Sequence, residues 1–465
     1  MYDATLAPFA DEAELRRLEE EYCSFGDTVH YLPDPKFFSG CNGSFMYDAA
    51  GGRFLDLQMW YSAVNFGYRN PRLNAVAAHQ LEVLPQVASQ YLHREKVELA
   101  AAIAQDAERK FGRKGRVHFN VGGAQAVEDS LKLVRNASGG KSLMFAFEGG
   151  YHGRTLGASA ITSSYRYRRR YGHFGERAQF IEFPYHFRGP KGMSKEEYGS
   201  YCVEKFARLF ETEYNGVLDT KTGQAEFAAF YVEPIQGTGG YVIPPRNFFV
   251  ELKKVLDRYG ILLVVDEVQM GFFRTGKLWS IEHFGVEPDI LVFGKALTNG
   301  LNPLSGLWAR EQLINPQVFP PGSTHSTFNA NPMGTAVGLE VMRMLAEGDY
   351  ETSVAEKGAY FLDGLKDLQR RWPQIGDVDG LGLALRAEIC EADGWTPNKT
   401  LLDRMADEGM KGDLDDGARR CGLILDVGGY HKNVITLAPS LHISREEIDL
   451  ALKLLDQLLR RCTQG

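Results

Sequence analysis

The sequence predicts an α/β fold with a mostly parallel central sheet flanked by helices, together with a smaller α+β domain. Two observations lead to this prediction. Between residues 60 and 330, short apolar runs alternate with longer helical stretches. Apolar runs separated by helices indicate βαβ crossovers and a buried, mostly parallel sheet. After about residue 331 the sequence is mainly helical with a few strands, which is typical of a separate, smaller unit.

The individual elements follow in chain order. We expect a helix over residues 12–21, and a β-hairpin in which residues 44–47 and 53–56 flank an Asp…Gly-Gly turn. The central region is expected to hold strands at 142–147, 228–233, 261–266 and 289–294, and helices at 124–136 and 248–259. Ser444 and Glu447 form a capping-box pattern, which predicts a closing amphipathic helix over 448–460.

These elements divide the chain into three parts. Residues 1–60 are expected to form an N-terminal segment that joins the small domain, residues 61–330 the large domain, and residues 331–465 the C-terminal small domain.

The formal charge is -8 and the pI about 5.8. This argues against nucleic acid as a partner, because phosphate-binding surfaces need an excess of Lys and Arg. The short basic cluster at 166–170 is either a solvated face or a feature that steers an anionic substrate.

The cysteines and the hydropathy pattern bear on the compartment. Six cysteines lie far apart, without a CxxC or Cys/His spacing, so we expect neither a metal site nor a disulfide framework. No apolar run reaches the ~18 residues that a membrane span needs. The first residues lack a basic stretch followed by an apolar one, so no secretory signal is expected. The expectation is a reduced, cytoplasmic enzyme.

Two strand ends carry the residues that indicate chemistry. Asp266 ends one buried run, and Lys295 follows the next run after a single glycine. Ligands bind at the carboxyl ends of parallel strands, and a sheltered lysine can form a Schiff base with an aldehyde cofactor. An aspartate beside a pyridine nitrogen keeps that nitrogen protonated. Either residue alone is more often a turn former or a surface residue, but the pair fits a pyridoxal cofactor.

Several segments together resemble the class III (ω-) aminotransferases. The resemblance covers nearly the whole chain, and the order and spacing of the segments agree. They are Asp56 with Asn65-Phe-Gly-Tyr68, Gly149-Gly-Tyr-His-Gly-Arg-Thr155, Glu233-Pro-Ile-Gln-Gly237, Asp266-Glu-Val-Gln269, Gly271-Phe-Phe-Arg-Thr-Gly276, Gly294-Lys-Ala-Leu297 and His325-Ser-Thr-Phe-Asn-Ala-Asn-Pro332. The resemblance implies a fold-type I enzyme that uses pyridoxal 5'-phosphate and moves an amino group from an amine or amino acid to an oxo acid in a ping-pong cycle.

The resemblance also implies roles for residues around the cofactor ring. Lys295 would form the Schiff base and shuttle the proton, and Asp266 would pair with the pyridine nitrogen. Gln269 would bond the phenolic oxygen. Tyr151 would stack on the ring, with core packing as its alternative. Glu233 would orient groups near the ring or form a structural salt bridge.

The cofactor phosphate has two expected contacts. Gly122, Gly123 and Ala124 precede a helix, and backbone N–H groups at a helix N-terminus bind phosphate. The family usually has a hydroxyl residue in this loop, and here there is none, so we expect backbone contacts to carry more of the binding. Thr327 would reach the phosphate of the neighbouring subunit's cofactor, which implies a homodimer with shared active sites.

The substrate side departs from the family pattern. Members that use glutamate have a glutamate where this chain has Thr238, and an arginine where it has Thr436. Recognition of 2-oxoglutarate by that pair is therefore not assumed. Arg386 is the first candidate for a substrate carboxylate and Arg154 the second, each with a structural ion pair as its alternative.

Two aromatic residues complete the expected substrate site. Trp60 and Tyr61 would form an aromatic wall of the pocket or pack in the core. For the reaction, an amino-acid racemase or epimerase of the same family is the main alternative to transamination. Two further hypotheses are decarboxylation-coupled transfer and a cofactor-binding protein without catalysis. The second conflicts with the presence of Lys295, Asp266 and Gln269.

Overall fold

The computed structural model describes residues 11–24, 26, 35–168 and 177–464. Part of the basic cluster, Arg169 and Arg170, lies outside these ranges, as do the first ten residues. Within the described residues, no helix is both long and apolar enough to cross a membrane.

A seven-stranded mixed sheet forms the centre of the large domain. Its order is β4-β12-β11-β10-β9-β5-β6. Its strands are β4 (Gly115–Asn120), β5 (Leu143–Phe147), β6 (Gln179–Ile181), β9 (Phe227–Val232), β10 (Leu262–Asp266), β11 (Ile290–Phe293) and β12 (Ser305–Arg310). Strands β11, β10, β9, β5 and β6 are parallel, and β12 alone runs against its neighbours β11 and β4. Strand β4 therefore points the same way as the parallel strands.

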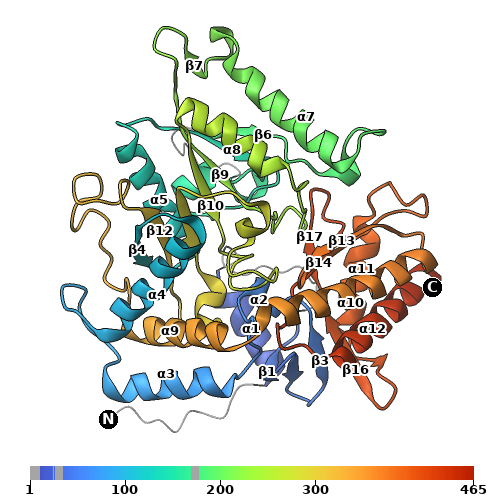
Figure 1. Cartoon of the computed structure of the whole chain (residues 1–465). Coiled ribbons are helices and arrows are strands. Elements are labelled where there is room, and N and C mark those ends of the chain that lie inside the picture. The colour runs from blue at the N-terminus through green and yellow to red at the C-terminus, as the bar shows by residue number, and fades with distance from the viewer. Residues whose placement is uncertain (1–10, 25, 27–34, 169–176, 465) are drawn as a thin grey trace.

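Both faces of this sheet are covered. Leu263 and Val265 of β10 face one core cluster, and Val264 between them faces another. This period of two, with apolar residues on both sides, is the pattern of a strand buried on both faces. Helix α5 (Gly123–Ala137) covers the face of Val264, and α4 (Arg94–Phe111), α7 (Lys195–Ala207) and α8 (Phe248–Tyr259) cover the other (Figure 1).

The C-terminal part has its own antiparallel sheet, of order β13-β14-β18-β17. Its elements are α10 (Tyr350–Arg371), β13 (Ile375–Leu381), β14 (Ala384–Ile389), α11 (Lys399–Gly409), β15 (Leu414–Asp415), β16 (Arg420–Ile424), β17 (Asp426–Gly428), β18 (Val434–Leu437) and α12 (Arg445–Gln464). Helices α10, α11 and α12 gather beside this sheet in Figure 1. Helix α9 (Pro332–Glu347) follows the expected boundary at residue 331, yet it packs against α3 (Pro71–Val83) and α4.

The N-terminal strands join the C-terminal part through one sheet. The order is β1-β2-β3-β16-β15, and β3 pairs with β16 in parallel through Leu55 and Leu423. The remaining elements of the described chain are α1 (Glu12–Tyr22), β1 (Phe38–Asn42), β2 (Phe45–Asp48), β3 (Arg53–Asp56), α2 (Met59–Ser62), α6 (Leu156–Ala160), β7 (Leu218–Asp219), β8 (Gln224–Ala225), and 3-10 helices at Tyr165–Tyr167, His186–Arg188, Arg208–Phe210, Glu213–Asn215, Ser280–Phe284 and Lys295–Thr298.

The predicted fold class is confirmed, and the expected elements lie within a few residues of the observed ones. The hairpin is β2 and β3, paired antiparallel. The capping box forms as expected, because the Ser444 hydroxyl accepts from the Glu447 N–H and the Glu447 carboxylate accepts from the Ser444 N–H.

Candidate active site

The site lies where the parallel strands end. Glu233 follows β9, Asp266 ends β10 and Lys295 follows β11 after Gly294. Tyr151 follows β5, and Gly122 follows β4 at the start of α5. Because these strands run in the same direction, their carboxyl ends meet at one edge of the sheet. The fold thus brings together residues that are separated by much of the chain.

Lys295 enters the site from a constrained backbone. Its φ is 43°, in the left-handed region that residues other than glycine rarely adopt. Such strain is typical of functional positions held by their surroundings. Burial lowers the pKa of Lys295, although the nearby charges of Asp266, Glu233 and Asp426 act in the opposite direction. A lowered pKa raises the fraction of neutral amine, which is the form that attacks an aldehyde.

Asp266 is held from two sides. One carboxylate oxygen accepts from the Val268 N–H at 3.0 Å, and the other accepts from His152 Nδ1 at 2.9 Å. His152 is almost fully buried, and burial alone would favour its neutral form. The hydrogen bond to Asp266 and the nearby carboxylates outweigh burial and raise the pKa of His152. The hydrogen bond with His152 therefore holds the Asp266 carboxylate in a fixed orientation.

Glu233 fixes the loop that carries Tyr151. Its two carboxylate oxygens accept from the backbone N–H groups of Tyr151 at 2.8 Å and Gly237 at 3.0 Å. Burial raises the pKa of Glu233 to about 7; His152 and these N–H donors offset the rise, and Asp266 adds to it. The side chain therefore bonds to backbone rather than forming a salt bridge.

Gln269 is also fixed in orientation. Its amide Nε2 donates to the Tyr241 hydroxyl at 3.1 Å. An amide nitrogen carries two N–H groups, so this bond leaves one donor for a cofactor oxygen. Tyr241 was not identified from the sequence as part of the site.

The expected phosphate loop lies against Val268, which stands between Asp266 and Gln269 in the sequence. A Cβ on Gly123 would stand 3.1 Å from the Val268 side chain, and one on Gly153 would stand 2.5 Å from the Cβ of Ala124. The N-cap Gly122 makes no side-chain hydrogen bond to α5, and a Cβ there would meet nothing within 4 Å. Uncapped N–H groups beside open space are what a phosphate group needs.

A cavity of about 280 Å³ contains Lys295. The other residues that line it are Tyr61, Tyr151, Arg154, Tyr167, Gly237, Thr238, Gln269, Asp426, Val427, Gly428 and Lys432. Tyr151 packs edge-to-face on Tyr167 at a centroid distance of 5.1 Å. The structure therefore brings Tyr61, Tyr151, Arg154 and Gln269 together around Lys295.

Tyr61 reaches this cavity from an unusual turn. The four residues of α2 (Met59–Ser62) all have positive φ, from 45° to 65°. A left-handed turn of this kind costs about 1–2 kcal/mol per residue. Asp56 holds its start by accepting from the N–H groups of Gln58 and Met59. The adjacent Trp60 is 57% exposed and lies against Gly300, so neither aromatic residue packs in the core.

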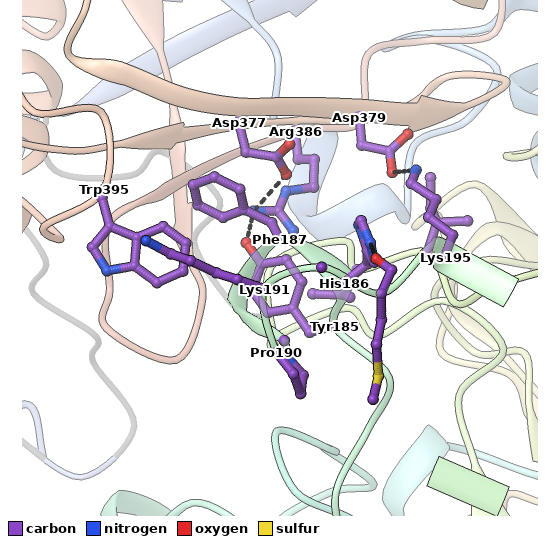
Figure 2. A pocket seen from close by; sticks show the side chains of 15 residues that line it. Tyr185, His186, Phe187, Pro190, Lys191, Lys195, Asp377, Asp379, Arg386 and Trp395 are labelled. Carbon is purple, nitrogen blue, oxygen red and sulfur yellow. Dashed lines mark hydrogen bonds and ion pairs between the residues drawn. The ribbon is translucent and has the colours of Figure 1, made fainter. Parts of the chain in front are cut away.

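Arg386 lies away from this cavity. It lines a second cavity of about 310 Å³ with Tyr185 and Asp377, and Figure 2 shows its guanidinium between them. Arg386 also pairs with Glu388 at 2.7 Å. Its carboxylate partner is thus supplied by the protein, and the geometry favours the structural ion pair over a substrate contact.

Thr327 is exposed and does not line the Lys295 cavity. Besides Tyr241, the sequence analysis did not identify His152, which bonds Asp266, or Asp426 and Lys432 in the cavity wall. The His152 position was visible within the motif around Tyr151. Asp426 and Lys432 carry no recognisable spacing.

The residues present fit pyridoxal 5'-phosphate. The buried amine of Lys295 would meet its aldehyde, Asp266 its ring nitrogen, and the start of α5 its phosphate. Fold and site thus define a pyridoxal-phosphate enzyme of fold type I.

Comparison with known proteins identifies the family. The family model "Aminotransferase class-III" matches residues 31–459. Alanine/serine racemase of Pyrococcus horikoshii is 32% identical, over 91% of this chain and 85% of its own. Probable 4-aminobutyrate aminotransferase of Bacillus subtilis is 30% identical, over 90% of this chain and 91% of its own. A thermostable (S)-enantioselective ω-transaminase from Thermomicrobium roseum is 28% identical with a TM-score of 0.86, and the match covers 98% of this chain and 100% of that one.

The chain belongs to the class-III aminotransferases. It is a pyridoxal-phosphate-dependent transaminase.

Proposed function

We propose that Lys295 is the catalytic residue of this transaminase, and that it both bonds the cofactor and carries the substrate proton. The observation that supports this role most directly is the burial of its amine at the edge of the sheet where Asp266 and Glu233 also lie. Among the described residues, no hydrogen bond or ion pair engages the Lys295 amine. The amine is therefore available for chemistry.

The other residues of the site position the reaction. When bound, the cofactor would supply an electron sink for the negative charge that develops at the substrate carbon. Asp266, held in place by His152, would hold the proton of the ring nitrogen. Gln269 would donate to the phenolic oxygen, and Tyr151, whose loop is fixed by Glu233, would cover one ring face. Gly122, Gly123 and Ala124 offer backbone N–H groups to the phosphate.

We also propose a homodimer in which Thr327 completes the partner's site. Thr327 is exposed, and its neighbour Phe328 is 67% exposed. Further large apolar side chains are exposed at Trp60, Tyr91 and Leu92. Exposed apolar side chains of this size are typical of a surface that another subunit covers.

A cytoplasmic location is part of the same proposal. Cys202, Cys390, Cys421 and Cys462 are buried as free thiols, and none of the cysteines in the described chain forms a disulfide. Free thiols are expected in a reducing compartment.

A racemase is the second candidate, because a relative with 32% identity bears that name. Both reactions begin by removing a proton from the substrate carbon. A racemase returns the proton to the opposite face of that carbon, whereas a transaminase returns it to the cofactor. The two therefore differ in whether the amino group leaves the substrate.

One experiment separates the two candidates. Amine and amino-acid donors are added singly to the holoenzyme without an oxo acid, and the visible absorbance of the cofactor is followed. Loss of the absorbance, with one oxo product per site, is the result expected for transamination. Retained absorbance, together with exchange of the substrate α-proton into solvent, would instead establish the racemase.

A further inference from the structure

The outer wall of the Lys295 cavity carries a carboxylate that the reaction described above does not use. Asp426 begins β17 and faces Thr436 of β18 across an antiparallel pair. The Thr436 hydroxyl donates to one of its oxygens at 2.6 Å, and the Gln58 amide donates to the other at 3.2 Å. Both donors are neutral, so the negative charge is solvated by the protein but not neutralised by it.

No cation among the described residues forms an ion pair with Asp426 within 4.0 Å. The charged groups around it are Lys295, Lys432, Arg166, Lys399 and Asp403, which line the Lys295 cavity or the cavity beside it, and Asp56, which acts on its charge. Burial raises the pKa of Asp426, and the hydrogen bonds from Thr436 and Gln58 offset part of that rise. An unpaired buried charge is costly, so its presence calls for a partner.

Asp426 also stands where two cavities meet. The Lys295 cavity and an adjoining one of about 410 Å³ share Tyr61, Asp426, Val427 and Lys432 in their linings. A substrate whose amine lies at Lys295 would therefore pass Asp426 if it extended outwards. The apolar parts of this passage come from Tyr61 and Val427, which suit a hydrocarbon chain.

We propose that Asp426 is a specificity residue that binds a second cationic group of the amino donor, so that the favoured donors are diamines or basic amino acids. The inference rests on the proposed role of Lys295, because the first amine of the donor must react there. An ammonium group at Asp426 would form a charge-assisted hydrogen bond in a sheltered site, which is stronger than a bond between neutral groups.

The position of Thr436 agrees with this assignment. An arginine in place of Thr436 would put a cation beside Asp426 and neutralise it. A threonine leaves the carboxylate intact and donates to it. At this point of the cavity wall, Asp426 and Thr436 therefore leave a carboxylate that can accept from a positive ligand group.

The test compares straight-chain diamines with monoamines of matching length. Each is added to holoenzyme without an oxo acid, and the second-order rate of cofactor absorbance loss is measured. The diamine is expected to react about 10- to 100-fold faster, the range of one charge-assisted hydrogen bond. Asp426→Asn should reduce this ratio towards one. Asp379→Asn removes a carboxylate that pairs with Lys195 at the separate cavity lined by Arg386. This variant should leave the ratio unchanged.

A second variant guards against a folding defect in Asp426→Asn. Asp426→Glu keeps the charge and moves it one methylene further into the cavity, so the favoured diamine should become shorter. Equal rates for diamines and monoamines in the natural protein would overturn the inference, as would an unchanged ratio in Asp426→Asn.

Binding can be measured apart from reaction. Enzyme loaded with pyridoxamine phosphate cannot react with amines, so calorimetry with a diamine reports binding alone. Binding that Asp426→Asn weakens about 10-fold or more supports the inference, and absence of binding overturns it. If no amine of either kind changes the holoenzyme absorbance, it is the proposed transamination through Lys295 that fails, and the calorimetry still decides the role of Asp426.

Discussion

Two buried clusters of charge differ in how their members are paired. Around Arg386, each charged group has an opposite charge within the cluster. Arg386 and Arg188 both contact Glu388. Asp377 lies 3.6 Å from Arg386 (Figure 2). Around Lys295, the amine and Asp426 have no direct ion-pair partner within the described chain. The first arrangement suits stability, and the second leaves its charges for ligands.

The largest expected effect is loss of Lys295. Lys295→Ala should abolish the absorbance of lysine-bound cofactor and reduce turnover by several orders of magnitude, because it removes the amine that bonds the cofactor and carries the substrate proton. Absorbance spectra and steady-state rates provide the measurement. The exposed Lys254→Ala on α8 serves as the control. Turnover near the natural rate would contradict the role of Lys295.

The Arg386 cluster should respond in stability and not in catalysis. Glu388→Gln removes the shared anion of Arg386 and Arg188, and breaking a buried pair costs about 3–5 kcal/mol. Thermal unfolding should shift to clearly lower temperature, while the Michaelis constant for the oxo acid stays the same. Glu391→Gln, at an exposed position of the same segment, should change neither.

A raised Michaelis constant for the oxo acid in Glu388→Gln would revive Arg386 as a substrate ligand. The two clusters would then no longer differ in whether their charged groups bind substrate.

Glu233 offers a pH-dependent test within the Lys295 cluster. Its pKa of about 7 in the folded protein lies above the ordinary 4.5, so its contribution to stability is complete below about pH 4.5 and is lost as the pH rises through 7. Glu233→Gln cannot ionise, so its unfolding temperature relative to the natural protein should increase over that window. The full effect is at most about 3 kcal/mol.

Unfolding of the cofactor-free protein at several pH values measures this difference. A constant offset between Glu233→Gln and the natural protein would show that Glu233 does not titrate in this range.

The smallest expected effect concerns the phosphate loop. A Cβ at Gly122 meets no atom within 4 Å and the residue is the extended N-cap of α5, so a serine fits there without strain. Gly122→Ser should tighten cofactor binding about 2- to 10-fold by adding one hydroxyl donor. Equilibrium dialysis of the cofactor checks the affinity. Gly123→Ala, whose methyl would crowd Val268 at 3.1 Å, should weaken binding instead.

The inner half of the site was predictable from the sequence, because residues at the ends of buried parallel strands must share one edge of the sheet. Asp266 and Lys295 lie where that rule places them. Arg386 was expected to be either a substrate ligand or part of a structural ion pair. Glu388, two residues later on the same face of the strand, provides the ion-pair partner.

The outer half of the site could not be predicted in this way. The sequence around Trp60 and Tyr61 does not predict a left-handed turn, because α2 contains no glycine. The role proposed for Asp426 depends on its hydrogen bonds from Gln58 and Thr436, which only the folded structure shows. Contacts between the two ends of the chain depend on tertiary packing and leave no local periodicity.

The parallel pairing of β3 with β16 has a consequence for how the protein is made. β3 (Arg53–Asp56) is synthesised long before β16 (Arg420–Ile424), so their pairing must wait until β16 has been made. The turn that carries Tyr61 directly follows β3. The large domain can therefore begin to fold during synthesis, whereas the part of the pocket wall that β17 carries can form only after β16 and β17 have been made.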